Sequence, residues 1–226
     1  TMSLTEYNKF LSSHTILPSS DPNTILVKKV GNNIKAAVEK FMNSNKKFKS
    51  RIAGYKWDFN VVDDNKTVNA WCMPGGKVVV YTGLLPITQN ETALAVVMGH
   101  EIAHAIARHG NERMSQGVAV QAGGAVLSTM VGTQSSATKD LFNQSYGAVS
   151  SLGVLAYSRK HELEADKLGL VFMALAGYDP KEAIPFWQRM ANASKGGTLA
   201  ILSTHPSDEK RIAEIKAFIP KAMKYY

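Results

Sequence analysis

Two histidines four residues apart, His100 and His104, enclose a glutamate at position 101. Residues at this spacing lie on the same face of a helix, so both imidazoles can reach one metal ion. Neutral imidazole is a common ligand of zinc. Glu101 lies about 100° further around the helix, where its carboxylate can reach a water molecule on the metal without replacing a histidine. The pattern is typical of metalloproteases, in which the glutamate acts as the general base.

The residues around this motif predict that it is buried. Positions 93–107 are apolar on nearly every side of a helix expected over about 91–109, with Asn90 as its cap and Gly110 as its stop signal. A helix that is apolar all round belongs in a protein interior. Three ionisable side chains are costly there unless they are paired or bind a metal. The alternative is a chance pattern of hydrogen-bonded core side chains, and the burial favours zinc.

Two histidines do not complete a catalytic zinc site, which normally has three protein ligands and one open position. The segment 158–166 supplies the candidates and should open a helix. Glu162 and Asp166 are four residues apart and share a face, whereas Glu164 points nearly opposite. We therefore expect Glu162 to be the third ligand. Asp166 would accept the second N–H of a ligating histidine. His161 and Glu164 are the alternative ligands.

A further histidine and an arginine lie near the C-terminal end. His205 stands in the sequence Thr204-His205-Pro206, ahead of a helix expected over about 207–219 that contains Arg211. A loop histidine and an arginine from the following helix could both reach a reacting carbonyl group.

The elements that must position these residues form a mostly helical α+β protein. Asp21 and Pro22 are start signals for a helix over about 22–44. Alternating or continuous apolar runs predict three strands, and the turn residues between them favour a small antiparallel sheet. The expected strands are 57–61, 68–72 and 77–81, and the expected later helices are 91–109, 112–131, 138–157, 159–176, 180–194 and 207–219.

Composition is that of a folded protein. The chain has 226 residues, 45% of them hydrophobic and 19% charged, and a formal charge of +8. Ten of its basic side chains but only three of its acidic ones lie in residues 1–56. We expect a basic helical N-terminal region, residues 1–56, packed on a catalytic domain, residues 57–226. A solvated lysine face accounts for the charge, and attraction to an anionic membrane surface is the alternative. Nucleic acid is disfavoured because residues 46–51 lack interleaved aromatic side chains.

The cysteine content, the N-terminal residues and one uncharged segment limit the kinds of metal site and membrane contact that are expected. Cys72 is the only cysteine, which excludes an intrachain disulfide and a cysteine-based zinc cluster. The first residues lack the pattern of a signal peptide, as expected of a cytosolic protein or of a mature chain whose signal was removed. Residues 114–138 contain no charged side chain, but they include too many polar residues to form a helix that spans a bilayer. A helix packed on the motif helix is expected there, with a lid or a shallow membrane contact as the alternative.

Taken together, these motifs resemble the M48 family of metallopeptidases, in particular its soluble BepA/Oma1-like branch, to which Ste24 and HtpX are related. The resemblance rests on the motif at 100–104, the run 162–166, and His205-Pro206 with Arg211. Residues 69–76 and 82–85 also resemble the segments before and after the family's active-site edge strand. The resemblance covers about residues 57–219.

The resemblance implies a zincin-like fold in which an edge strand of the small sheet borders the active site. It implies one Zn²⁺ held by His100, His104 and Glu162, with Glu101 as base and Asp166 behind the ligands. His205 and Arg211 would help to stabilise the oxyanion. In some relatives the histidine at the position of His205 can occupy the fourth zinc position and keep the enzyme silent.

The expected function is hydrolysis of extended or misfolded polypeptides in envelope quality control, in a bacterial periplasm or cell envelope after signal removal. An extended substrate is expected to pair with the strand Lys77, Val78, Val79, Val80 and Tyr81. The first alternative is a zinc-stabilised chaperone or peptide-binding module with little or latent activity. The second is a basic adaptor for a membrane surface or nucleic acid, based on residues 1–56.

Overall fold

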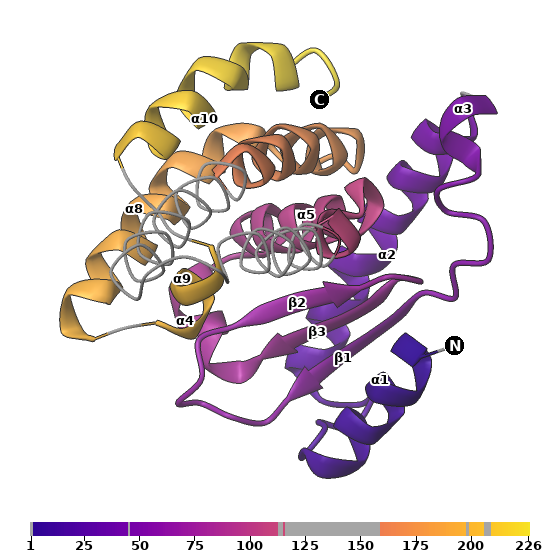
Figure 1. Ribbon diagram of the computed structural model, residues 1–226. Coiled ribbons are helices and arrows are strands. Elements are labelled where there is room, and N and C mark those ends of the chain that lie inside the picture. Colours follow the sequence, from indigo (N-terminus) through magenta and orange to yellow (C-terminus); the bar gives the residue numbers. More distant parts are fainter. Residues whose placement is uncertain (1, 45, 113–114, 116–158, 198, 206–208) are drawn as a thin grey trace, which may run out of the picture. The chain divides into compact units, whose positions relative to one another are not determined.

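A computed structural model describes residues 2–44, 46–112, 115, 159–197, 199–205 and 209–226 (Figure 1). The chain divides into two compact units, residues 1–107 with 163–226 and residues 108–162. The division expected at residue 56 coincides with neither boundary and stays a prediction. The helix expected over 138–157, most of that over 112–131, and nearly all of the uncharged stretch 114–138 lie outside the described residues.

Helices surround one small sheet in the first unit, as the sequence predicts (Figure 1). An unlabelled helix covers 159–175 and runs across the boundary between the two units. The labelled elements are α1 (Met2–Ser13), α2 (Pro22–Asn43), α3 (Lys46–Lys49), β1 (Asp58–Val62), β2 (Ala70–Met73), β3 (Lys77–Tyr81), η1 (Thr82–Leu84), α4 (Leu85–Thr88), α5 (Glu91–Ala107), η2 (Pro180–Glu182), α8 (Ala183–Ala193), η3 (Ser194–Gly196), α9 (Ala200–Thr204) and α10 (Glu209–Ala222).

The motif helix α5 lies in the core. Every residue from 93 to 107 is buried. At its start the amide of Ala93 donates to the Asn90 side chain over 2.8 Å, which satisfies one of the free N–H groups of the first turn. The helix ends at Ala107 rather than near Gly110, because Arg108 takes a left-handed conformation with φ of 65°. The side chain of Tyr55 donates to the carbonyl of Ala105 in the last turn.

Helix α2 confirms its predicted start and packs beside α5. Asp21 has an extended backbone, and its carboxylate accepts from the amide of Asn23 over 2.8 Å, as an N-cap does. Apolar residues at helical spacing, among them Val27, Val30 and Ile34, are fully buried. They join α5 and one face of the sheet in the main hydrophobic core.

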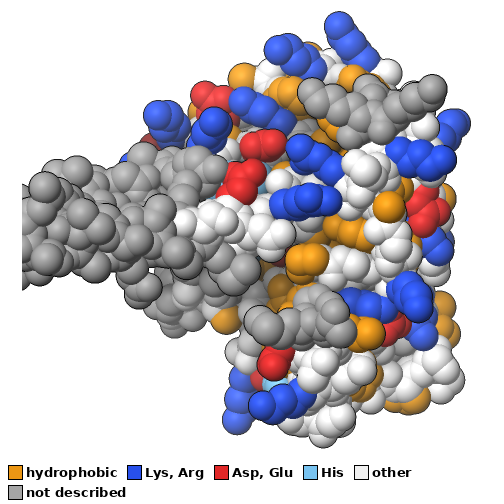
Figure 2. Space-filling model, turned by 45° about the vertical axis from the view of Figure 1, so that its right-hand side comes forward, with side chains coloured by type: hydrophobic (Ala, Val, Ile, Leu, Met, Phe, Trp, Pro, Cys, Tyr) orange, Lys and Arg blue, Asp and Glu red, His pale blue; other side chains and the backbone are white. Residues whose placement is uncertain are grey.

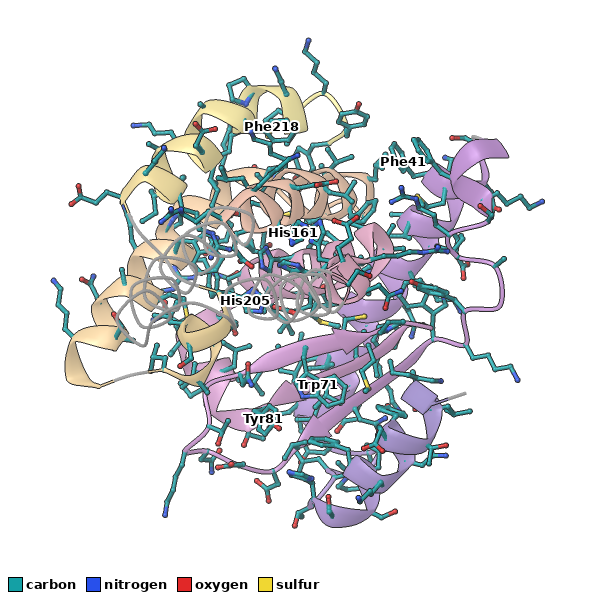
Figure 3. The ribbon with its side chains drawn as sticks, in the orientation of Figure 1. Phe41, Trp71, Tyr81, His161, His205 and Phe218 are labelled. Carbon is teal, nitrogen blue, oxygen red and sulfur yellow. The ribbon has the colours of Figure 1, made fainter. Side chains whose placement is uncertain are left out.

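The sheet is mixed rather than antiparallel, and its strand order is β1-β3-β2. Strand β3 pairs in parallel with β1 and antiparallel with β2. Val78 and Val80 of β3 face the main core, and Val79 and Tyr81 face a second cluster under α1. Trp71 and Tyr81 project from that same side (Figure 3). The continuous apolar run of β3 therefore reflects a central strand that is covered on both faces.

The two outer strands differ at their free edges. The segment 15–17 covers the outer edge of β1: Leu17 N donates to Val61 O over 2.9 Å, and Asp63 N donates to Thr15 O over 2.8 Å. Within the described residues β2 pairs with β3 alone, and α5 packs against it. The edge strand next to the motif helix is therefore β2.

Two glycines bring α5 into backbone contact with the helix over 159–175. A Cβ on Gly99 would lie 2.9 Å from the carbonyl oxygen of Gly169, and one on Gly169 would lie 2.8 Å from the amide nitrogen of His100. No side chain longer than hydrogen fits between these backbones. This contact sets the distance between the helix that carries the two histidines and the helix that carries Asp166.

We expect Gly169→Ala to lower the free energy of unfolding by about 1–3 kcal/mol, because a methyl group must push two backbones apart. Urea denaturation of the variant measures this loss. Gly110→Ala is the matched control: it also lies in a helix, and a Cβ there meets nothing within 4 Å. Equal effects of the two substitutions would show that the close contact is not what matters.

Two surface features bear on the membrane hypothesis. None of the helices in the described ranges combines the length and apolar character needed to cross a membrane. On the face visible in Figure 2, Lys and Arg side chains are dispersed, with acidic side chains among them. Lys29 of α2 pairs with Glu91 over 2.8 Å. The Lys and Arg side chains visible in Figure 2 therefore form no single basic patch on that face.

Candidate active site

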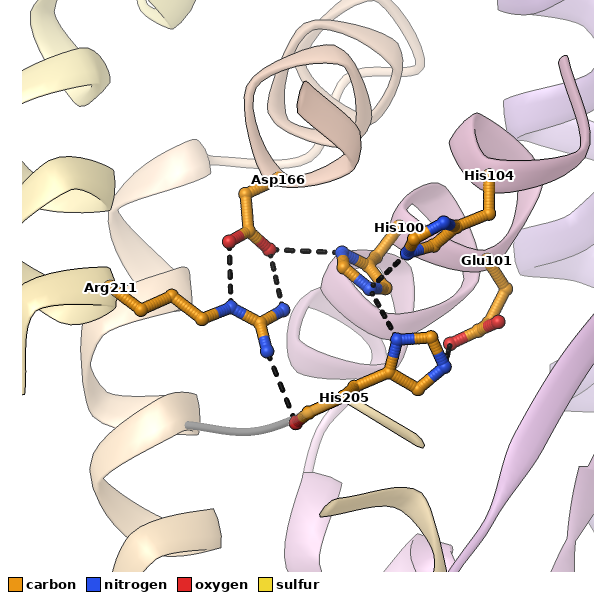
Figure 4. A network of polar contacts seen from close by, with 6 residues as sticks. All are labelled: His100, Glu101, His104, Asp166, His205 and Arg211. Carbon is orange, nitrogen blue, oxygen red and sulfur yellow. Dashed lines mark hydrogen bonds and ion pairs between the residues drawn. The ribbon is translucent and has the colours of Figure 1, made fainter. Parts of the chain in front are cut away.

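Helix α5 presents its two histidines to a buried cluster of polar side chains (Figure 4). The Nε2 atoms of His100 and His104 are 3.0 Å apart, as their spacing on one helix face predicts. His100, Glu101 and His104 are 3%, 3% and 6% exposed. At this depth the cost of desolvation requires partners for all three groups.

Asp166 contacts the Nδ1 atom of His100, and Arg211 binds Asp166 in turn. A carboxylate oxygen of Asp166 lies 2.9 Å from Nδ1 of His100. Arg211 binds the same carboxylate with two hydrogen bonds, from Nε over 2.7 Å and from Nη2 over 2.8 Å. The carboxylate favours a proton on Nδ1 of His100, which leaves the Nε2 lone pair directed into the cluster.

The pKa of Asp166 reflects this environment. Burial by itself raises it, but the charge and hydrogen bonds of Arg211, with a smaller contribution from His100, lower it to about 2. The carboxylate is therefore ionised at neutral pH, and it pairs with a guanidinium that is itself only 4% exposed.

This lowered pKa predicts a loss of stability in acid. Because the pKa of the folded state is below the unfolded value of 3.8, the stabilisation is complete above about pH 4 and is lost as the pH falls toward about 2. The shift corresponds to about 2 kcal/mol. Urea unfolding of the metal-free chain at several pH values measures it. Asp166→Asn should lack this component, and an unchanged pH profile in that variant would contradict the assignment.

His205 reaches the same cluster from the end of α9. Its amide donates to Ile201 O over 2.9 Å, and its carbonyl accepts from Nη1 of Arg211 over 3.2 Å. Its Nδ1 lies 3.3 Å from Nε2 of His100, and its Nε2 lies 3.5 Å from Oε1 of Glu101. The residue, labelled in Figure 3, is 7% exposed.

Four buried side chains form a group that could hold a metal ion: His100, His104, Glu162 and His205 each offer one ligand atom, and these atoms lie within 4.8 Å of one another. Ligands about 2.0–2.1 Å from a tetrahedral zinc ion are separated by about 3.3 Å. The distances between ring nitrogens of 3.0 and 3.3 Å are close to that value. The imidazole and carboxylate donors therefore fit zinc in both chemistry and spacing.

The alternative ligands predicted near Glu162 are engaged elsewhere. Nε2 of His161 lies 3.0 Å from a carboxylate oxygen of Glu112, and its ring stacks on that of His109 with centroids 4.1 Å apart. Glu164 is exposed. Neither belongs to the ligand group found in the described residues, whereas Glu162 lies on the same helix as Asp166, one turn before it.

The predicted edge position of the strand Lys77–Tyr81 is wrong. Residues Lys77–Tyr81 form β3, the central strand, whose backbone groups are paired with β1 and β2. The strand that packs most extensively on α5, the helix that carries Glu101, is β2. A continuous apolar run, the mark of a strand covered on both faces, was the signal for the central position.

Arg211 differs from its predicted place facing a reacting carbonyl. Its donors point to Asp166 and to the backbone of His205, and its guanidinium carbon lies 4.0 Å from the ring centroid of Trp187. This geometry favours a positioning role, and the predicted oxyanion role stays a prediction. The sequence indicated Trp187 only as a residue of an expected helix, with nothing to connect it to Arg211.

Comparison with known proteins places this site in a family. The model of peptidase family M48 matches residues 29–219. The mitochondrial metalloendopeptidase OMA1 of Schizosaccharomyces pombe is 36% identical over 221 residues, which cover 96% of this chain and 59% of that protein. OMA1 of Saccharomyces cerevisiae is 35% identical over 218 residues, 93% of this chain and 60% of the relative. The chain thus spans 59–60% of the length of these fungal relatives.

A bacterial relative matches over a shorter stretch. The β-barrel assembly-enhancing protease of Yersinia pestis is 30% identical over 161 residues, 68% of this chain and 32% of that protein. The predicted periplasmic or cell-envelope location is wrong, since the relatives with higher identity are named mitochondrial proteins. The family match over most of the chain and the fungal relatives above 30% identity show that this chain belongs to peptidase family M48.

Proposed function

We propose that the chain is a zinc-dependent endopeptidase that cleaves extended or unfolded polypeptides. The observation that carries this proposal is the buried group His100, His104, Glu162 and His205, with Glu101 beside it. Membership of a peptidase family supports the reaction class, and the relatives named metalloendopeptidases support a metal-dependent internal cleavage.

Each residue of the site has a separate role in metal binding or proton transfer. His100, His104 and Glu162 would hold the zinc ion, with Asp166 orienting His100. When bound, zinc supplies a Lewis acid that polarises a carbonyl group and lowers the pKa of water. Glu101 accepts the proton of the attacking water and delivers it to the leaving amine, as a general base and then a general acid. Its 3% exposure excludes bulk water from this transfer.

An extended substrate would pair with β2 rather than with β3. Strand β2, residues Ala70–Met73, is the edge strand on which α5 packs, and the opposite edge of the sheet is covered by residues 15–17. Main-chain hydrogen bonds to an edge strand bind a peptide largely independently of its side chains. This mode favours unfolded segments as substrates, because a folded protein offers few extended backbones.

His205 supports a closed resting state. Its Nδ1 is as close to Nε2 of His100 as a fourth zinc ligand would be, and it belongs to the ligand group. The imidazole would then occupy the position that a substrate carbonyl or water needs. This arrangement also favours the alternative function, a zinc-stabilised peptide-binding module whose proteolysis is latent.

We expect His205→Ala to raise the steady-state cleavage of an unfolded substrate. If the closed arrangement holds nine molecules in ten, opening all of them raises the rate on the order of tenfold. The visible spectrum of the cobalt-substituted chain should change in the same variant, because one imidazole ligand is lost. A fall in cleavage with an unchanged cobalt spectrum would instead assign His205 to oxyanion stabilisation.

The proposed function is tested with the purified chain and unfolded casein. We expect internal cleavage that stops after removal of metal by 1,10-phenanthroline and returns on addition of stoichiometric zinc. Elemental analysis should give zinc in the active preparation. The alternative result is that the chain binds zinc and suppresses aggregation of the casein, but neither the wild type nor His205→Ala cleaves it. That result would favour the binding module over the peptidase.

A further inference from the structure

The ring of Trp187 on α8 lies next to the guanidinium of Arg211. The guanidinium carbon of Arg211 is 4.0 Å from the centroid of the Trp187 ring. The two side chains come from different helices, and the residues are 2% and 4% exposed. The Trp187 ring is also 6.1 Å from the ring of His100, centroid to centroid, at an angle of 75°.

Three in-plane hydrogen bonds orient the guanidinium, but none of them contacts its two faces. Its donors lie in the plane of the group and point to both oxygens of Asp166 and to the carbonyl of His205. The faces of this plane offer no donor, so side chains packed against a face add to its resistance to tilting. An indole ring attracts a cation over its face, by about 2 kcal/mol where both groups are desolvated.

We propose that Trp187 is a positioning residue of the metal site. By stacking on Arg211, it sets the plane in which the guanidinium grips Asp166, and so the orientation in which Asp166 meets Nδ1 of His100, 2.9 Å away. This inference rests on the proposed zinc site. Trp187 would act on the ligand His100 through Arg211 and Asp166, without contacting the metal itself.

The surroundings make the site sensitive to loss of the indole. A cavity of about 10 Å³ is lined by Trp187, His100 and Asp166, with apolar side chains around them. A smaller side chain at position 187 would enlarge it on the side of the ion pair. Water admitted there would compete for the Asp166 carboxylate and weaken its hold on His100.

Three variants separate positioning from packing. Trp187→Leu removes the aromatic face, and Trp187→Phe restores it in a smaller ring. Phe186→Leu is the matched control, because Phe186 is the neighbouring residue on α8, is fully buried, and belongs to the main core. The dissociation constant for Zn²⁺ is measured on the full chain by competition with a chromophoric chelator, and thermal unfolding is followed on the metal-free chain.

We expect Trp187→Leu to weaken zinc binding about tenfold, the lower end of the effect of groups behind a metal ligand. Trp187→Phe should recover most of this loss. Phe186→Leu should lower the thermal stability with less than a twofold change in zinc affinity, a change too small to count as positioning. Equal weakening by Trp187→Leu and Phe186→Leu would reduce the effect to core packing and overturn the proposal.

A double-mutant cycle tests whether Trp187 affects zinc binding through Arg211. If Trp187 acts through Arg211, Trp187→Leu should cause no further loss of zinc affinity in an Arg211→Gln background. Losses that multiply would overturn the proposal. Should Trp187→Leu fail to fold, fluorinated tryptophan placed at position 187 keeps the shape of the ring and weakens its negative face. Zinc affinity should then fall as fluorine is added, and a constant affinity would contradict the role.

A failure of this proposal can be distinguished from a failure of the proposed function. A wild-type chain that binds zinc and cleaves casein, with an unchanged dissociation constant in Trp187→Leu, sinks only the role of Trp187. A wild-type chain that binds no zinc removes the metal site itself.

Discussion

Replacement of Glu101 by Gln is expected to slow peptide-bond cleavage by about 10²–10⁴-fold, the usual contribution of a general base, while zinc stays bound. Glutamine keeps the shape of the side chain but cannot take a proton from water. Glu101 is not one of the four potential ligands, so its charge is not needed to hold the ion. Initial rates on a quenched fluorescent peptide and zinc content by elemental analysis measure the two quantities.

A matched control for this variant is Glu164→Gln, which removes an exposed carboxylate from the helix over 159–175. Its activity and zinc content should equal those of the wild type. If Glu101→Gln lost zinc in proportion to activity, the carboxylate would be a ligand and the role of base would be withdrawn.

Removal of the Asp166 carboxylate should have the largest effect on stability. Asp166→Ala leaves the guanidinium of Arg211 buried without its charge partner, which typically costs about 3–5 kcal/mol. It also removes the acceptor beside Nδ1 of His100, for which we expect a 10–100-fold weaker binding of zinc. Urea unfolding of the metal-free chain gives the first quantity, and competition with a chelator gives the second.

The double variant Asp166→Leu with Arg211→Met separates the two effects. An apolar pair of similar size can replace a buried ion pair at little cost, so stability should recover. Zinc affinity should remain low, because His100 still lacks its acceptor. Recovery of both quantities would show that Asp166 stabilises the fold and does nothing for the metal site.

Much of the site could be predicted from the sequence because its parts obey helix periodicity. His100 and His104 are four residues apart on α5, and Glu162 and Asp166 are four apart on the helix over 159–175. Such spacings fix a common face whatever the rest of the fold does. The start of α2 and the three strands were also predictable, since caps, prolines and apolar runs are local signals.

Long-range arrangements were not predictable in the same way. Sheet order depends on which strands meet, and the parallel pairing of β1 with β3 joins segments that are not consecutive in the chain. The position of Arg211 between Asp166 and Trp187 requires three helices to pack in one way. Nothing in the spacing of these residues specifies that packing, so the sequence suggested an arginine that faces substrate.

The contact between Gly99 and Gly169 also bears on how a metal ion would enter and leave. Packed side chains can change rotamer and let two helices separate a little, but a contact between two backbones has no such freedom. The helices that carry His100 and Asp166 therefore behave as one rigid wall. His205, by contrast, follows a helix of only five residues and is tied by its own carbonyl to Arg211. We expect exchange of the ion to proceed by displacement of the His205 segment, at a rate that substitutions in α9 change.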